Sequence, residues 1–192
     1  MAAFAALGSA GAFAQTIVDD WSNVKVPPPP QLEPVAVAPR TDALLVLDFN
    51  GADAADSGPG NRATKPRCLA SLPKTRELID KARAKGVFVV YSVSTNGAPV
   101  VKSGPDKFLH TDLGELLANK GIKTVIVTGT VSEGAVLVTA TDAALHGMDV
   151  VVPVDGMSST ELYAEQYVAW RLTHAPGVGP KTTLTRIDMI GF

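Results

Sequence analysis

The chain has 192 residues, of which 46% are hydrophobic and 19% are charged, and its formal net charge is −2 at pH 7. This length fits one domain with an ordinary buried core. The nearly balanced charge, without a run of Lys and Arg, argues against nucleic acid or an anionic membrane as a partner. We expect a small, roughly neutral molecule as the substrate or ligand.

Cysteine and histidine are scarce. The only cysteine is Cys68, which excludes an internal disulfide. The three histidines, at positions 110, 146 and 174, lack the close pairing that zinc sites use. We therefore expect neither a metal ion nor another cofactor.

Residues 1–14 are apolar and rich in alanine, and they end in Ala12-Phe13-Ala14, which resembles the small-residue cleavage site of a secretory signal. The basic segment that begins such a signal is missing, so a flexible Ala-rich tail is the alternative. The stretch is too short to span a bilayer. A signal-peptide remnant predicts a periplasmic or secreted protein, whereas a tail leaves a cytoplasmic location open.

Residues 15–40 contain an unbroken run of four prolines, from Pro27 to Pro30, and further prolines at 34 and 39. Proline has no backbone N–H to donate to a strand ladder, and proline runs favour an extended helix. We expect an extended arm or surface wrap, which precedes a domain of residues 41–192.

From residue 43 onward, short apolar runs alternate with segments of helical spacing. Strands are expected at 43–48, 87–93, 124–128, 150–154 and 182–184, and helices at about 72–85, 111–120, 133–145 and 160–172. The alternation predicts βαβ units, and hence a three-layer, Rossmann-like α/β fold with a mostly parallel sheet of five to six strands and helices on both faces. Ligands of such sheets bind outside the carboxyl ends of the strands.

Asp48 lies at that edge, directly after the apolar run 44–47. A carboxylate there is partly desolvated and favours a nearby cation, although it can also simply cap the following loop. Lys102 and Lys107 lie in the loop after the second strand, close enough to the same edge to pair with Asp48. A loop lysine is more often a solvated charge.

A second candidate site lies where the third strand passes into the next helix. Gly129 permits an unusual turn, and the first amides of the helix, around residues 131–135, face the edge with the positive end of the helix dipole. Such amides can hold an oxyanion. A strand-to-helix turn without chemical use is the alternative.

Two further side chains near this edge have both a chemical and a structural interpretation. Glu133, in the first helical turn, can act as an acid or base on water, or can face solvent and favour the helix dipole. Cys68 precedes the first helix, where a displaced nucleophile would lie, or is a small buried hydrophobic residue.

Three motif blocks in this order resemble those of the isochorismatase-like superfamily of cysteine hydrolases. The resemblance spans about residues 41–155 and depends on order, spacing and secondary structure together. The blocks are Leu44-Leu-Val-Leu-Asp48-Phe49, then Val101-Lys102 with Phe108 and Thr111-Asp112-Leu113, then Thr128-Gly129-Thr-Val-Ser-Glu-Gly-Ala-Val136 with Thr139, Asp142-Ala143 and Gly147.

The resemblance implies that Asp48 is a general base and Lys102 a catalytic lysine. It favours Lys102 over Lys107 because the family's lysine lies six residues before the aromatic residue that Phe108 matches. Phe49 and Phe108 are expected to contact substrate. Since the family commonly forms dimers or larger assemblies, a homo-oligomer is also expected.

The resemblance further implies an oxyanion hole made by the backbone amides of Val131 and Ala135, with a cis peptide bond at Thr130-Val131. The metal-binding histidines of the nicotinamidase branch are absent after the second predicted strand.

Ala135 occupies the position of the family's cysteine nucleophile. A methyl group cannot attack a carbonyl, so covalent thioester chemistry is excluded at this position. A natural Cys-less hydrolase, similar in this respect to isochorismatase itself, is favoured because Ser132-Glu133 also depart from the cysteine pattern. An engineered Cys-to-Ala change and a binding-only pseudoenzyme stay open. The favoured interpretation is a small-molecule hydrolase acting on an amide, imide or vinyl ether.

Overall fold

A computed structural model describes residues 16–49, 66–92 and 104–192 of the chain. The signal-like segment 1–14 and Lys102 lie outside the described residues, so the predictions about them stay predictions.

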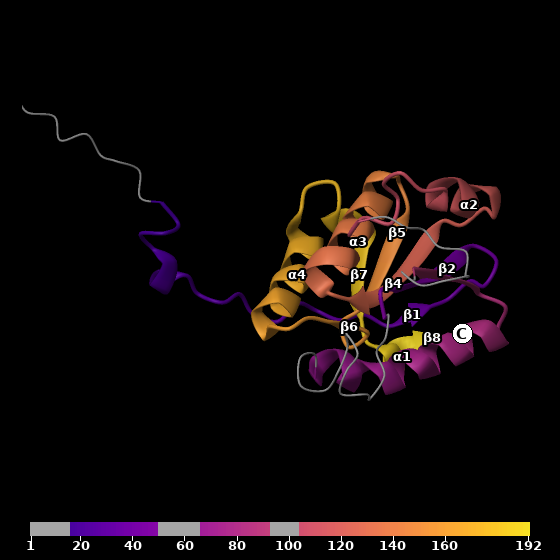
Figure 1. The fold of residues 1–192 in the computed structure, drawn as a ribbon, viewed down its shortest axis with the longest axis horizontal. Helices are drawn as coiled ribbons and strands as arrows, with labels where there is room; N and C mark the ends of the chain where they lie inside the picture. The colour runs from indigo at the N-terminus through magenta and orange to yellow at the C-terminus, as the bar shows by residue number, and fades with distance from the viewer. Residues whose placement is uncertain (1–15, 50–65, 93–103) are drawn as a thin grey trace, which may run out of the picture.

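Within the described residues, the centre of the domain is a six-stranded sheet (Figure 1). Five strands lie in the order β3-β2-β4-β5-β7, and β6 pairs with the end of β4; all of these pairings are parallel. β3 lies on one side of β2, and β4 and the later strands lie on the other, so the strand order reverses between β2 and β4. Parallel sheets bind ligands at such a switch point. The strands are β2 (Asp42–Leu47), β3 (Phe88–Ser92), β4 (Thr124–Thr130), β5 (Asp149–Pro153), β6 (Met157–Ser158) and β7 (Thr182–Thr185).

Helices cover both faces of the sheet, which confirms the predicted three-layer α/β fold (Figure 1). Helix α1 (Pro66–Ala84) covers one face, and α2 (Leu113–Asn119), α3 (Leu137–Leu145) and α4 (Leu162–His174) cover the other. No helix among the described residues is long and apolar enough to cross a membrane.

Strand β2 is buried along its whole length because it has a helical layer on each side. Leu44 and Val46 pack in the cluster on the α1 side, and Leu45 and Leu47 pack in the cluster on the other side. Successive side chains of a strand point to opposite faces, so a strand between two layers needs apolar residues at every position.

Three short strands were not predicted: β6 of the main sheet, and two strands that form a separate pair. β1 (Val35–Ala36) pairs in parallel with β8 (Ile190–Gly191), and the backbone N–H of Glu33 donates to the carbonyl of Leu184 at 2.9 Å. Strands of two residues are too short to show a period in sequence. The last residues of the expected arm are thus hydrogen-bonded to the domain.

Some helix boundaries also differ from the sequence prediction. Helix α1 begins at Pro66, six residues before the start of the helix expected at about 72–85. Proline suits the first helical position because its missing N–H would be unpaired there. The helix expected at 133–145 is preceded by a single wide turn, Ser132–Val136, with π-type hydrogen bonding, and α3 proper begins at Leu137. Hydrophobic spacing does not distinguish these two helical forms.

Candidate active site

Asp48 lies at the carboxyl end of β2, beside the end of β4. Leu47 is opposite Gly129 in the parallel register. Asp48 has φ of 54°, in the left-handed region that Asp adopts more easily than most residues. Its side chain is 30% exposed, so the carboxylate is accessible from the edge of the sheet.

Two side chains hold the Asp48 carboxylate. The hydroxyl of Ser92, at the end of β3, donates to Oδ1 at 2.7 Å. The ammonium of Lys107 donates to Oδ2 at 2.8 Å and to the carbonyl of Gly104 at 3.0 Å. The Lys107 side chain is only 5% exposed. A buried ammonium needs an opposite charge and hydrogen-bond acceptors, and these contacts supply both.

Lys107 is fixed at its backbone as well. Its N–H donates to the hydroxyl of Thr139, in the first turn of α3, at 3.2 Å, and that hydroxyl donates to the carbonyl of Pro105 at 3.3 Å. The family spacing favours Lys102 over Lys107. In the part of the chain that the structure describes, Lys107 is the lysine that pairs with Asp48.

Sequence reasoning missed Ser92 as a site residue. Ser92 is opposite Leu47 in the register of β2 and β3, so it ends its strand next to Asp48. A polar residue at the end of an apolar strand was the available signal, but using it required knowing which strands are neighbours.

The turn after β4 requires glycine at position 129. A Cβ there would lie 2.6 Å from both the Cβ and the carbonyl oxygen of Leu47. The peptide bond between Thr130 and Val131 is cis, as the resemblance implied. The chain then enters the wide turn, where the N–H of Gly134 donates to the carbonyl of Val131 at 3.2 Å.

Ala135 lies within this wide turn and is 3% exposed, so its methyl group packs in the hydrophobic cluster on the α3 side. Val131 and Ala135 are thus on one turn, at the edge of the sheet where β2 and β4 end. Glu133 is exposed, and its carboxylate accepts a hydrogen bond from the Ser132 hydroxyl at 3.2 Å. This placement favours the solvent-facing interpretation of Glu133.

The two aromatic candidates occupy different places. Phe49 is half-buried and packs against the cluster on the α1 side. Phe108 is 8% exposed, and its ring stacks on His146 at 5.3 Å between centroids. His146 follows the last turn of α3, whereas Lys107 contacts the first turn. The structure therefore places Phe108 in the core and does not bring its ring together with Asp48.

Cys68 is buried in the first turn of α1, at 2% exposure, and its carbonyl accepts a hydrogen bond from Ser71. Across residues 16–49, 66–92 and 104–192, no three or more His, Cys, Asp or Glu side chains are grouped so that they could hold a metal ion. The expected absence of a metal stays a prediction.

A row of hydroxyl groups continues the polar edge beyond Asp48. Thr130 of β4 is opposite Ser158 of β6. The hydroxyls of Thr130, Ser158 and Ser159 are buried and have no hydrogen-bond partner in the described part of the chain. A buried unpaired hydroxyl costs about 1–3 kcal/mol.

An ion pair joins the two helical layers next to this row. The guanidinium of Arg67, on α1, donates two hydrogen bonds to the carboxylate of Glu165, on α4, one of them from Nε at 2.8 Å. The hydrogen bond to Glu165 raises the pKa of Arg67. The same carboxylate accepts the backbone N–H of Ser159 at 2.9 Å.

Comparison with known sequences supports the family resemblance. Residues 93–183 match the family model described as Isochorismatase domain. A streptothricin hydrolase from Streptomyces noursei is 32% identical over 157 residues, which cover 68% of this chain and 60% of the relative. The chain thus spans less than two thirds of that relative's length.

Comparison with solved structures supports the fold. The nicotinamidase from Bacillus subtilis superposes with a TM-score of 0.65 at 16% identity, over 76% of this chain and 100% of that chain. A cysteine hydrolase from Pseudomonas syringae pv. phaseolicola gives a TM-score of 0.65 at 18% identity, over 83% of this chain and 94% of that chain. The motif blocks, the sheet order and these matches agree: residues 93–183 match the Isochorismatase domain, and the chain has the fold of the isochorismatase-like superfamily of cysteine hydrolases.

Proposed function

We propose that the chain hydrolyses an amide, imide or vinyl ether of a small molecule, without a cysteine nucleophile at the usual position. The observation that carries this proposal is the Asp48 carboxylate, which is held by Ser92 and by the buried ammonium of Lys107. Such a carboxylate at the ligand-binding edge of a parallel sheet is placed to accept a proton.

For an amide, the proposed reaction uses water as the nucleophile. Asp48 removes a proton from water while the water oxygen bonds to the carbonyl carbon. The amides of Val131 and Ala135 hold the resulting oxyanion. Asp48 then returns the proton to the leaving nitrogen as the C–N bond breaks. General acid–base catalysis of this kind contributes about 10²–10⁴-fold in rate.

The lysine of this reaction has two candidates. Lys107 touches Asp48, so it neutralises the carboxylate in the resting state and balances its changes of charge. Lys102 is the candidate that the family spacing favours. We propose that one of these two lysines compensates the negative charge of Asp48 during turnover. Comparison of the Lys102→Met and Lys107→Met variants identifies which one.

The relatives suggest the class of substrate. One is a streptothricin hydrolase and another a nicotinamidase, and each name indicates a small organic molecule as substrate. We propose a small organic molecule as the substrate of this chain as well.

A second candidate function is binding without turnover. The observation that favours it is Ala135, which has a methyl group at the position of the family's nucleophile. An engineered Cys-to-Ala replacement would give the same inactive pocket. Both alternatives predict that the chain binds a ligand and releases no product.

A turnover screen separates these functions. The parent chain and the Asp48→Asn, Ala135→Cys and Asp188→Asn variants are incubated with amides, imides and vinyl ethers, and products are measured by mass spectrometry. Asn keeps the shape of Asp and tolerates the left-handed conformation, so Asp48→Asn is expected to fold normally and to lose at least about 100-fold in kcat/KM. Asp188 is exposed and serves as the matched control.

The proposal requires turnover by the parent and by Asp188→Asn. An inert parent that gains activity only on Ala135→Cys would contradict it and would identify an inactivated enzyme or a pseudoenzyme with an intact pocket.

A further inference from the structure

The N-terminal arm, here residues 16–31, carries apolar side chains that the domain does not cover. Within eleven residues, five large hydrophobic side chains are between 58% and 74% exposed. Single exposed hydrophobic residues are ordinary, whereas a group of this size marks an interaction surface. These residues are Ile17, Val18, Trp21, Val24 and Val26.

Helix α4 carries a second apolar surface. Tyr163, Tyr167 and Trp170 follow the spacing i, i+4 and i+7, so they lie on one helical face, and their exposed fractions are 69%, 39% and 38%. Leu162, 65% exposed, extends this α4 stripe at its first turn. The opposite face of α4 is buried against the sheet.

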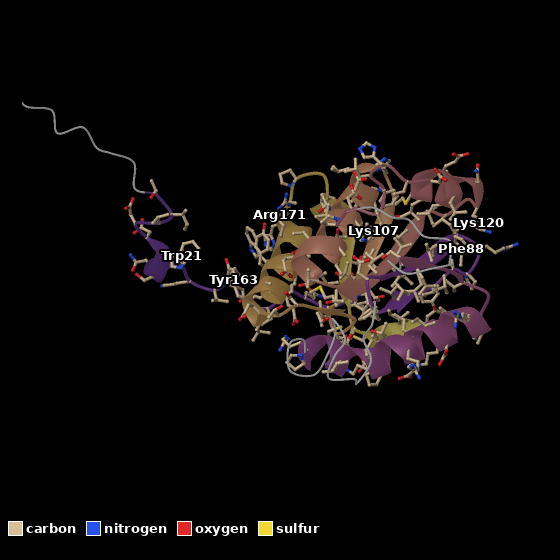
Figure 2. The ribbon with its side chains drawn as sticks, in the orientation of Figure 1. Trp21, Phe88, Lys107, Lys120, Tyr163 and Arg171 are labelled. Atoms are coloured by element: carbon tan, nitrogen blue, oxygen red, sulfur yellow. The ribbon has the colours of Figure 1, made fainter. Side chains whose placement is uncertain are left out.

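The arm leaves the domain beside this helix. Leu32 packs against the core cluster that contains the buried face of α4, and Glu33 is hydrogen-bonded to Leu184 of β7, the strand next to α4. Figure 2 shows Trp21 on the arm, outside the domain, on the side where Tyr163 lies.

The prolines keep the arm from folding back onto its own domain. A polyproline helix extends about 3.1 Å per residue and is stiff over several residues, so Pro27 to Pro30 act as a rigid spacer of about 12 Å. Figure 1 shows the arm extending away from the domain beyond that spacer. The apolar residues of the arm are therefore presented to another molecule.

We propose that residues 16–26 of one copy pack on the α4 stripe of a second copy, and that the exchange is reciprocal in a two-fold dimer. A two-fold axis makes both contacts identical and closes the assembly. Aromatic side chains bury about 150–250 Å² each when fully covered. Four exposed aromatic residues and five aliphatic residues per contact, doubled by symmetry, are on the scale of the roughly 1,200–2,000 Å² of a stable interface.

The charges of the two surfaces are complementary. The arm carries Asp19 and Asp20 before its first basic residue, Lys25. The last turn of α4 carries Arg171 and His174. The Nη1 group of Arg171 is buried and has no hydrogen-bond partner among the described residues. The positive charge of Arg171 would attract an arm carboxylate of the second copy to the end of α4.

The first test is the mass of the full chain in solution, measured by sedimentation equilibrium. The parent is expected to be a dimer. Trp21→Ser and Tyr167→Ser are each expected to raise the dimer dissociation constant at least about tenfold, because buried aromatic residues dominate interfaces. Leu109→Ser is the control, since Leu109 is 55% exposed but lies outside both surfaces, and it should leave the constant unchanged. A monomeric parent, or a dimer that both substitutions leave intact, would overturn the proposal.

The second test locates the arm. Two chains of different mass are prepared with Cys68→Ala, one with Trp21→Cys and the other with Tyr167→Cys, and they are mixed and oxidised. A disulfide between the two chains is expected, and Leu109→Cys in place of Tyr167→Cys should give none. A chain that carries both new cysteines and cross-links only within itself, at every concentration, would show that the arm packs on its own helix and would also overturn the proposal.

Discussion

The charge of Asp48 is balanced by a lysine that is almost fully buried. Lys107 reaches Asp48 from a loop 59 positions further along the chain, and Thr139 fixes its backbone. Removing the ammonium leaves the carboxylate with the Ser92 hydroxyl as its remaining described partner. The lysine therefore controls both the charge and the position of the proposed general base.

We expect Lys107→Met to lower kcat/KM by about 100-fold, because the ammonium that holds Asp48 is lost while the aliphatic volume is kept. The measurement is steady-state kinetics on the substrate found in the screen, with Lys102→Met run in parallel. A large loss in Lys102→Met, with near-parental activity in Lys107→Met, would refute the assignment to Lys107.

A second residue-scale prediction concerns Asp142 on α3. Burial raises the pKa of this carboxyl, repulsion by Asp106 raises it further, and His146 opposes both effects. A raised folded-state pKa means that the protonated carboxyl stabilises the fold at low pH, and that this contribution is lost as pH rises through the folded pKa. Asp142→Asn should therefore gain stability relative to the parent as pH rises from 3 to 7.

Thermal unfolding across this pH range measures the effect as the difference in Tm between Asp142→Asn and the parent. Asp112→Asn is the control because Asp112 is exposed, and its Tm difference should stay flat. A Tm difference for Asp142→Asn that falls with rising pH would have the wrong sign for a raised pKa.

For single residues, the sequence predicts which side chains and amides lie at the ends of strands. Asp48, Val131 and Ala135 could be placed because each is within a few residues of a strong apolar run. Lys107 and Ser92 could not be assigned, because their roles depend on which strands are neighbours and on the path of a loop. Hydrophobic periodicity contains neither kind of information.

The end of β4 depends on the absence of a side chain at Gly129. The backbone of Leu47 approaches Gly129 so closely that a Cβ cannot be accommodated without movement of β2 or β4. Both strands carry parts of the proposed site at their ends. The fit of this glycine thus sets the spacing between Asp48 and the proposed oxyanion hole.

Gly129→Ala is expected to lower the free energy of unfolding by at least about 2 kcal/mol, since the clash is with backbone and with a buried Cβ. Gly114→Ala is the matched control. A Cβ at Gly114 meets only Phe108, at 3.6 Å, and alanine favours the helix α2. Urea denaturation measures both, and equal effects of the two substitutions would disprove the special role of Gly129.

Elements of ordinary length could be predicted, and short or irregular ones could not. The six residues of β2 and the thirteen of α4 show clear apolar patterns. β1, β6 and β8 have two residues each, too few for a period. The apolar residues of the wide turn at 132–136 have the spacing of an α-helix, so only its hydrogen bonds distinguish it from one.

At the scale of the whole molecule, Glu165 ties together the two helical layers on opposite faces of the sheet. Its side chain is 12% exposed, while that of its partner Arg67 is 40% exposed. Loss of Glu165 would also unpair the backbone N–H of Ser159, a buried residue. Removal of either residue therefore leaves a buried group without its partner.

Glu165→Ala and Arg67→Ala are each expected to cost about 2–3 kcal/mol of unfolding free energy, because the first leaves the buried N–H of Ser159 unpaired and the second leaves a nearly buried carboxylate without its cation. Chemical denaturation provides the comparison. Glu77→Ala is the control, as Glu77 forms an exposed pair with Lys81 worth about 0.3–0.5 kcal/mol. A loss for either variant no larger than that for Glu77→Ala would contradict this account.

The pairing of β1 with β8 affects the order in which the protein can fold as it is synthesised. The hydrophobic cluster beneath α1 joins Val37 and Leu44 to Ile187 and Ile190, which are synthesised much later than the first two. A ribosome releases residues in sequence order. The cluster on the other face also needs a late residue, Leu184 of β7. Neither helical layer can therefore be fully packed until the C-terminal strands have left the exit tunnel.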